Sequence, residues 1–158
     1  MKHLLFIAVT LCLALTGCTS ISTVNLLEPG RFASNESRFP GQATIYVFRG
    51  SGMSGAMWSF PITIDGKAVG SIRREQYLAI PATEGAHWLT VICPALCEIP
   101  GFKINMDVRA DHSYHLMYEP NVSFGYNTVT TSTNLTQIPK EFADRLMENY
   151  KQGQHVGP

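Results

Sequence analysis

Residues 62–72 have the sequence ITIDGKAVGSI, in which the pair Asp65-Gly66 separates two stretches rich in β-branched residues. A two-residue turn of type I′ needs positive φ at both central positions, and Asp-Gly is among the sequences that adopt it most readily. Alternation of apolar and polar residues on both sides is typical of strands with one buried face. The stretch therefore predicts a β-hairpin, and the rest of the chain follows the same pattern.

Strand-like segments recur on both sides of this hairpin, separated by turn residues every 8–12 positions. They are ATIYVFR at 43–49, a stretch ending at Ile80, 87–93 after a turn at Glu84-Gly85, 102–108, 114–118 after a turn at Ala110-Asp111, and 122–133. In 102–108, Ile104, Met106 and Val108 alternate onto one face. About seven short strands with regular turns predict a mainly β chain folded as an antiparallel β-sandwich.

The C-terminal part is the one region with helical periodicity. Pro139 suits a first helical turn, and Phe142, Leu146 and Tyr150 recur at intervals of four, with Ala143 and Met147 beside them. We expect an amphipathic helix over 139–151 that packs its apolar stripe against the sheet, followed by a frayed tail. The domain is expected to span residues 43–158.

The N-terminus has the layout of a secretory signal. Lys2 precedes an apolar run from Leu4 to Leu15, and the small residues Thr16 and Gly17 follow. The run is too short for a membrane span, which needs roughly 20 apolar residues. Residues 1–17 are therefore predicted to be a cleaved signal peptide.

The residues that end this run, Leu15-Thr16-Gly17-Cys18, resemble the lipobox of bacterial lipoproteins. The resemblance implies cleavage before Cys18, which would carry a thioether-linked diacylglycerol and an acylated amine, palmitate being a typical acyl group. Several acyl chains on one residue anchor a protein stably. Thr19 at the next position favours the outer membrane, facing the periplasm, by the sorting rule of enteric-type bacteria. Residues 18–42, rich in polar residues, Pro and Gly, would be a tether. It would span roughly 27 Å as a flexible chain, or alternatively dock on the domain through Leu26-Leu27 or Phe39.

The charge balance excludes an electrostatic role in binding nucleic acid. The chain has 12 Lys and Arg against 12 Asp and Glu, without a run of like charges. Its hydrophobic fraction of 45% is ordinary for a globular domain with a proper core.

The four cysteines take separate roles in this scheme. Cys12 leaves with the signal, Cys18 is lipidated, and Cys93 and Cys97 remain for an oxidising periplasm. We expect these two to form a disulfide across Pro94. A redox or metal pair is the alternative. However, thioredoxin-like sites have the spacing C-x-x-C and not C-x-x-x-C. A zinc site would need a second pair of ligating cysteines, which the sequence does not contain.

Several of these segments together resemble a family of small bacterial lipoproteins with a domain of unknown function. IYVFR at 45–49, IDGKAVGSI at 64–72, Tyr77 and GAHWLTV at 85–91 are similar to the family's YVYR-like strand, DGK-x-x-G hairpin and PG-x-H-x-L strand. The match covers roughly residues 43–118, and Glu84 stands where the family has Pro. The resemblance implies a β-sandwich on a lipid anchor and carries no activity with it.

Catalytic and cofactor motifs are missing from the sequence. The loop GSGMSG at 50–55 does not end in the Lys-Ser/Thr pair of a phosphate-binding loop. It is better explained as a mobile hairpin loop. His112 and His115 fall on opposite faces of a strand, and His87 after a turn glycine suits a structural hydrogen bond. We therefore expect a protein that is not an enzyme, with no catalytic residues, cofactor or metal.

A binding surface is the remaining candidate for function. Met53, Met57 and Trp58 in the first loop, and Phe124 and Tyr126 near the last strand, are candidate contact residues. Trp58 and Phe60 are equally well explained as core residues, two apart on one strand face. The sequence favours a membrane-anchored binding or envelope-structural module, contacting an envelope protein or the cell wall. A cell-envelope hydrolase and an inhibitor of wall-degrading enzymes are the alternatives.

Overall fold

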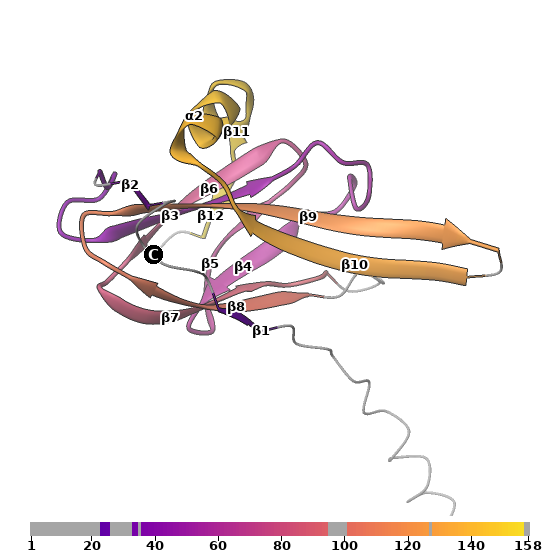
Figure 1. The fold of residues 1–158 in the computed structure, drawn as a ribbon, viewed down its shortest axis with the longest axis horizontal. Helices are drawn as coiled ribbons and strands as arrows, with labels where there is room; N and C mark the ends of the chain where they lie inside the picture. The colour runs from indigo at the N-terminus through magenta and orange to yellow at the C-terminus, as the bar shows by residue number, and fades with distance from the viewer. Residues whose placement is uncertain (1–22, 26–32, 35, 95–100, 127, 157–158) are drawn as a thin grey trace, which may run out of the picture.

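The computed structural model describes residues 23–25, 33–34, 36–94, 101–126 and 128–156. These residues form two packed β-sheets and a single described helix, α2 (Lys140–Asn149), which lies on the outer face of one sheet (Figure 1). The predicted fold class, a mainly β sandwich with one C-terminal helix, is confirmed. Eight strands, β3 to β10, have five residues or more, close to the expected number of about seven, and four shorter strands extend the sheets.

The first sheet contains the Asp-Gly hairpin near one of its edges. Its order is β1 (Thr23–Asn25), β8 (Phe102–Val108), β7 (Gly85–Val91), β4 (Phe60–Ile64), β5 (Lys67–Ile72) and β12 (Gln154–His155). Asp65 and Gly66 have φ of 51° and 79°, so both central residues of the turn have the positive φ that type I′ requires. The predicted hairpin is therefore present, with β4 and β5 as its arms.

The second sheet has its central strand, β3, between partners that are distant in sequence. Its order is β10 (Thr128–Gln137), β9 (Ser113–Gly125), β3 (Ala43–Arg49), β6 (Gln76–Ala82) and β11 (Lys151–Gln152), and β2 (Ala33–Ser34) also pairs with β9. Most pairs among the described strands are antiparallel, but β3 runs parallel to β9. Because β3 and β4 belong to different sheets, the connection between them crosses the sandwich and is not the hairpin loop that the sequence suggested.

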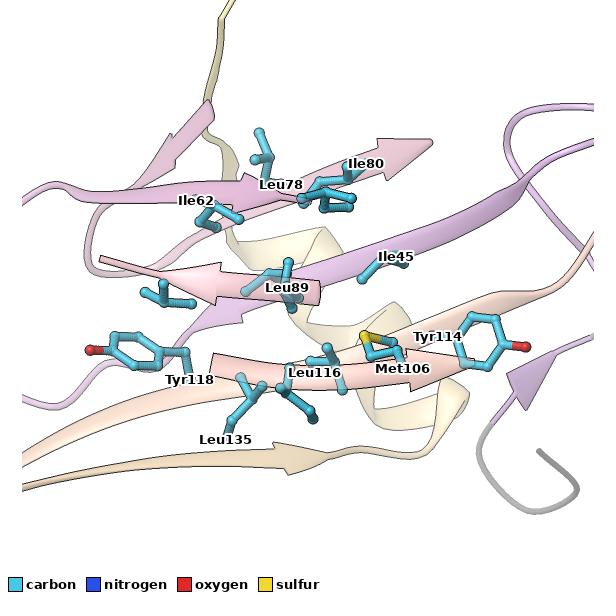
Figure 2. Packing of buried hydrophobic residues seen from close by; sticks show 14 of the residues in the cluster. Ile45, Ile62, Leu78, Ile80, Leu89, Met106, Tyr114, Leu116, Tyr118 and Leu135 are labelled. Atoms are coloured by element: carbon cyan, nitrogen blue, oxygen red, sulfur yellow. The ribbon is translucent and has the colours of Figure 1, made fainter. Parts of the chain in front are cut away.

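The core fills the space between the sheets. Ile104, Met106 and Val108 of β8 are all buried, as their alternation predicted. Figure 2 shows side chains from both sheets, among them Ile45, Leu89 and Leu116, gathered between the layers. Each fully buried large aliphatic side chain contributes about 1.5–3 kcal/mol relative to exposure. This apolar layer holds the two sheets together.

A second, smaller apolar cluster lies between α2 and the outer face of the second sheet. Phe48 and Met117 of the sheet pack there with Ile138 and Ala143. The strand β3 is thus covered on both faces. Partly buried side chains complete the cluster: Tyr46, Tyr77, Leu146, Met147 and Tyr150.

The helix differs from its prediction in length and orientation. It spans Lys140–Asn149, with Pro139 as an extended N-cap, and not 139–151. Phe142, expected in the apolar stripe, is exposed and lies beneath the Arg145 guanidinium at 5.6 Å. The packed stripe is centred on Ala143 instead. An α-helix turns about 100° per residue, so Ala143, Leu146 and Tyr150 share a face from which Phe142 is rotated away.

The segment 122–133, expected as one last strand, is divided between two. Residues up to Gly125 end β9, and β10 begins at Thr128, so the two form a long antiparallel hairpin. Tyr118 and Leu135 are partners in it and both belong to the core. Beyond this pair the hairpin projects past the sandwich (Figure 1). We call the projecting part, residues 119–126 and 128–134, the arm.

Both ends of the chain are more structured than expected. The described residues of the segment 18–42 do not form a free tether: β1 pairs with β8, β2 pairs with β9, and Gly41 N donates to the Asp111 carboxylate at 2.7 Å. In the tail 153–158, expected to be frayed, Gln154 and His155 form β12 and pair with β5 of one sheet. Just before it, β11 pairs with β6 of the other sheet. The predicted signal peptide, residues 1–17, and Cys18 lie outside the described residues.

Candidate functional site

Two regions of the structure are candidates for function: the end of the sandwich that carries the first loop and the arm, and a polar pocket beside α2. We call residues 50–59 the contact loop, and the contact loop with the arm the loop–arm end. The contact loop leaves β3 after Arg49 and enters β4 at Phe60. Two tight turns shape it, in which Ala56 N donates to Met53 O and Trp58 N donates to Gly55 O, each at 3.0 Å.

The buried side chain of Arg49 holds the contact loop in place. Its side chain is fully buried, with the guanidinium 5.7 Å from the Phe60 ring. Nη1 donates to Gly50 O at 3.0 Å, and Nη2 donates to Ser54 O. Burial lowers the pKa of Arg49, but guanidinium stays protonated in proteins, so the loop carbonyls face a permanent cation. A buried cation that binds backbone carbonyls holds the loop in one conformation.

The neighbouring Tyr118 stays neutral beside this cation. It is fully buried and packs edge-on against Phe60, with ring centroids 5.3 Å apart. Burial raises the pKa of Tyr118 to about 12, although the charge of Arg49 acts in the opposite direction. The phenol is therefore a structural group at neutral pH, and it closes the core where the arm begins.

The contact loop is joined to the arm and to the β5–β6 turn. Val122 N of the arm donates to Ser54 Oγ at 3.2 Å. On the other side, Arg74 Nη1 approaches Met53 Sδ at 3.1 Å, and the same guanidinium pairs with Glu75 at 3.3 Å. The loop and the arm, distant in sequence, thus form one continuous surface.

The predicted contact residues fall into three groups. Met53, Met57 and Tyr126 are exposed by 75%, 95% and 96%. Trp58 is partly buried and packs on the core, as its alternative explanation proposed, and Phe60 is fully buried. Phe124 lies in β9 opposite Val129, and its side chain is outside the described part of the structure. The structure therefore brings the two predicted contact regions together at one end.

The polar pocket lies between α2, the second sheet and residues 34 and 36–38, with a volume of about 230 Å³. Its wall includes His115, only 1% exposed, whose ring stacks on Tyr46 at 5.2 Å with an interplanar angle of 10°. Lys140 and Asp144 of the helix form an ion pair of 2.7 Å at its rim. The remaining lining residues are Ser34, Glu36, Ser37, Arg38, Ser113 and Met147.

The hydroxyl groups of this pocket serve the fold. Ser113 Oγ donates to Glu36 O, and Ser37 Oγ shares a hydrogen bond of 2.7 Å with Thr44 Oγ1. These bonds hold residues 36–44 against the sheet. Burial raises the pKa of Tyr46, so its phenol is protonated at neutral pH. The pocket therefore offers neutral hydroxyls and an imidazole together with an ion pair at its rim, a lining suited to a small polar molecule.

Of the other histidines, His87 lies where the sequence predicted, whereas His112 is not on the strand that was expected to carry it with His115. His112 belongs to the turn before β9, where its Nδ1 lies 2.7 Å from Ala110 O, while His115 points to the helix-covered face. His87 makes the expected structural bonds, to Asp65 Oδ2 at 2.7 Å and to Thr83 O at 2.8 Å.

The cysteine predictions fall mostly on residues outside the described ranges. Cys93 is disulfide-bonded. Cys97 is not among the described residues, so the pairing of Cys93 with Cys97 stays a prediction.

Metal-binding groups and membrane-spanning helices are not found among the described residues. Within the described ranges, His, Cys, Asp and Glu side chains form no group of three able to hold a metal ion. The same residues contain no helix long and apolar enough to cross a membrane. No protein family, curated protein or solved structure matches this chain.

Sequence reasoning missed Arg49 and the His115 pocket. The sequence does contain a signal for Arg49. Arg49 ends a strand whose other residues, apart from Tyr46, are all apolar or β-branched. A buried cation at this position needs hydrogen-bond acceptors. The pocket had no such signal, because its walls come from four segments that only the tertiary fold brings together.

Proposed function

We propose that this chain is a bacterial lipoprotein anchored through Cys18, and that its sandwich is a binding or envelope-structural module that works through the loop–arm end. The signal-like residues 1–17, the LTGC sequence and the resemblance to small lipoproteins support the anchor. Thr19 supports the outer membrane, with the domain in the periplasm.

One observation carries the binding role: large apolar side chains are exposed at the same end of the sandwich, on segments that hydrogen bonds hold in place. A partner that covered Met53, Met57 and Tyr126 would remove their apolar surface from water, and large exposed apolar side chains of this kind are typical of interaction sites. The carbonyl bonds of Arg49 and the Ser54–Val122 bond fix this surface before a partner arrives. Such preorganisation lowers the entropy cost of binding.

Metabolic labelling with radioactive palmitate tests the anchor. We expect label in the wild-type chain and in the control Cys12→Ala, which alters a cysteine inside the apolar run. We expect none in Cys18→Ala. Label that persists in Cys18→Ala would overturn the anchor.

Crosslinking in purified envelope fractions tests the contact surface. Met57→Asp places a carboxylate on the exposed contact loop and should remove the crosslinked species that the wild type forms. Ala68→Asp places the same group on an exposed residue of β5, next to the Asp65-Gly66 turn, and should leave them unchanged. Equal effects of the two variants would contradict a role for the loop–arm end.

A second candidate function is favoured by the pocket. His115, Asp144 and Ser113 converge on it, so a hydrolase acting on a small polar group of cell-wall material is the alternative. Release of soluble fragments from purified cell wall, abolished by His115→Gln with the fold retained, would favour this activity. Absence of turnover by the wild type would remove it.

A further inference from the structure

The structure determines which end of the sandwich the N-terminal chain enters. In β1, Thr23 pairs with Lys103, the second residue of β8, and Phe102 beside it pairs with Val91. Ile92 N in turn donates to Pro61 O. Pro61 is the second residue of β4, the strand that the contact loop enters. Thr23 therefore lies at the same end of the two sheets as the contact loop. Because β1 runs parallel to β8, the chain enters the sheet from this end.

The chain between the predicted anchor and the sheet is short. Five residue steps separate Cys18 from Thr23, and a fully extended chain covers at most about 3.6 Å per residue, so the two lie within about 18 Å. This is less than the span of roughly 27 Å expected of a free tether over residues 18–42. A lipid on Cys18 would hold the loop–arm end close to the membrane that contains it.

The charged residues of the loop–arm end lie beside the contact loop and at the base of the arm: Arg73, Arg74 and Glu75 in the β5–β6 turn, and Glu119. Residues 120–139, which include most of the arm, contain no charged residue, and neither does the contact loop at 50–59. The opposite end has charged residues in its turns: Asp65, Lys67, Glu84, Arg109 and Asp111. Charged groups are costly to bring into a bilayer, so the contact loop and the part of the arm beyond Glu119 are the parts that can approach lipid.

The exposed side chains of the loop–arm end suit the boundary between headgroups and acyl chains. Tyr126 lies beyond the last pair of the arm, Gly125 with Thr128, and is 96% exposed. Tyr combines an apolar ring with a polar hydroxyl, and such side chains are enriched at membrane interfaces. Met53 and Met57 add flexible apolar groups, and Arg74 beside Met53 can meet lipid phosphate.

We propose that the loop–arm end lies on the membrane that holds the Cys18 lipid, with Tyr126 and Met57 in the interface of the bilayer. The proposal rests on the lipid anchor of the proposed function and names the lipid surface as the partner of the loop–arm end. The sandwich then contacts the membrane in two ways, through the acyl chains and through the protein surface. The end with the Asp65-Gly66 turn faces away from the lipid.

Fluorescence quenching in vesicles tests this arrangement. The lipidated chain is reconstituted in phosphatidylethanolamine–phosphatidylcholine vesicles, some with brominated acyl chains that quench tryptophan on contact. Tyr126→Trp adds an indole to the arm, and Ala68→Trp adds one at the opposite end as a matched control. Trp58 and Trp88 are present in both, so the wild-type signal is subtracted. We expect the indole added to the arm to be quenched at least roughly twofold more than the indole of the control.

The outcomes separate the proposal from the anchor on which it rests. Lack of flotation with vesicles overturns the anchor, and the membrane contact with it. Flotation with the arm indole quenched no more than the control indole overturns the membrane contact alone. A third outcome is a blue shift of the arm indole's emission as protein concentration rises, measured without brominated lipid. This shift would show that a second copy covers the arm, which also contradicts the membrane contact.

Discussion

The hydroxyl oxygen of Ser54 accepts a hydrogen bond of 3.2 Å from the backbone of Val122, and this bond joins two segments 68 residues apart. It links the contact loop to the arm, so the two exposed regions form a single surface. The bond is partly buried, and Val122 also packs on the core. The apolar end of the molecule is therefore held by a specific contact and is not a pair of independent loops.

Ser54→Ala should separate the loop from the arm. It removes the acceptor of Val122 N, and a hydrogen bond of this kind contributes about 0.5–1.5 kcal/mol to stability. We expect a decrease of that size in the free energy of urea unfolding, with faster amide exchange at Val122. Ser51→Ala alters an exposed serine of the same loop and should leave both unchanged. Equal behaviour of the two variants would mean that the bond is not formed in solution.

Arg49→Met should loosen the contact loop while keeping the core packed. The Met side chain replaces the aliphatic part of Arg49 but leaves Gly50 O and Ser54 O without the donors they have now. A buried acceptor left without a donor costs about 1–3 kcal/mol. Limited proteolysis should then cut within residues 50–59 well before the sandwich unfolds. A variant as resistant to protease as the wild type would show that Arg49 does not hold the loop.

Gly70→Ala should disturb the closure of the two sheets by the C-terminal tail. A Cβ at this position would lie 2.8 Å from Leu78 Cδ2 and closer still to the backbone oxygen of Gln154, which pairs with this strand. Overpacking of this kind costs about 1–3 kcal/mol. Gly52→Ala, where a Cβ would meet no atom within 4 Å, is the matched control. We expect a lower melting temperature for Gly70→Ala only, and a melting temperature equal to the control would contradict the docking of β12 on β5.

The Asp65–His87 pair should make stability depend on pH. Bonds from Trp88 N and from His87 lower the pKa of Asp65. Burial acts to lower the pKa of His87, but the bonds to Asp65 and Thr83 O outweigh it and raise that pKa. The contribution of the histidine is therefore complete below its ordinary pKa of about 6.5 and is lost as pH rises through its higher folded pKa. The contribution of the aspartate to stability is present above its ordinary pKa of about 3.9, and it is lost as pH falls through its lower folded pKa.

Asp65→Asn isolates this effect, because Asn can still accept from Trp88 N and tolerates the positive φ at this position. The wild type should exceed the variant in unfolding free energy by less than about 1 kcal/mol, since the pair is partly exposed. The difference should be largest near pH 5–6 and shrink above the folded pKa of His87. A difference that is constant from pH 5 to 9 would show that the pair does not titrate as described.

Regular strands and tight turns were predictable from sequence because each has a local cause. Asp65-Gly66 encodes its turn by backbone preference, and the alternation in β8 follows directly from burial of one face. The stripe of α2 was misplaced because residues four apart drift around the helix, so Phe142 lies at the edge of the packed face while the small Ala143 lies at its centre.

Long-range features had no such local signal. Strands of two or three residues, such as β11 and β12, are too short for a periodic pattern, and their pairing depends on the sheets already being formed. The parallel pairing of β3 with β9 and the bond from Val122 to Ser54 join segments far apart in the chain. The contact residues were therefore identified singly from sequence, but their position at one end came only from the fold.

The most direct test of the lipid anchor, on which the account rests, is the mass of the N-terminal tryptic peptide of the mature protein. We predict a peptide that begins at Cys18 and ends at Arg31, carrying a diacylglycerol on the sulfur and an acyl chain on the amine. Alkaline hydrolysis should remove the ester-linked chains and leave the amide-linked one. A mature chain that keeps residues before Cys18, or that has a free thiol at Cys18, would contradict both the anchor and the contact of the loop–arm end with the membrane.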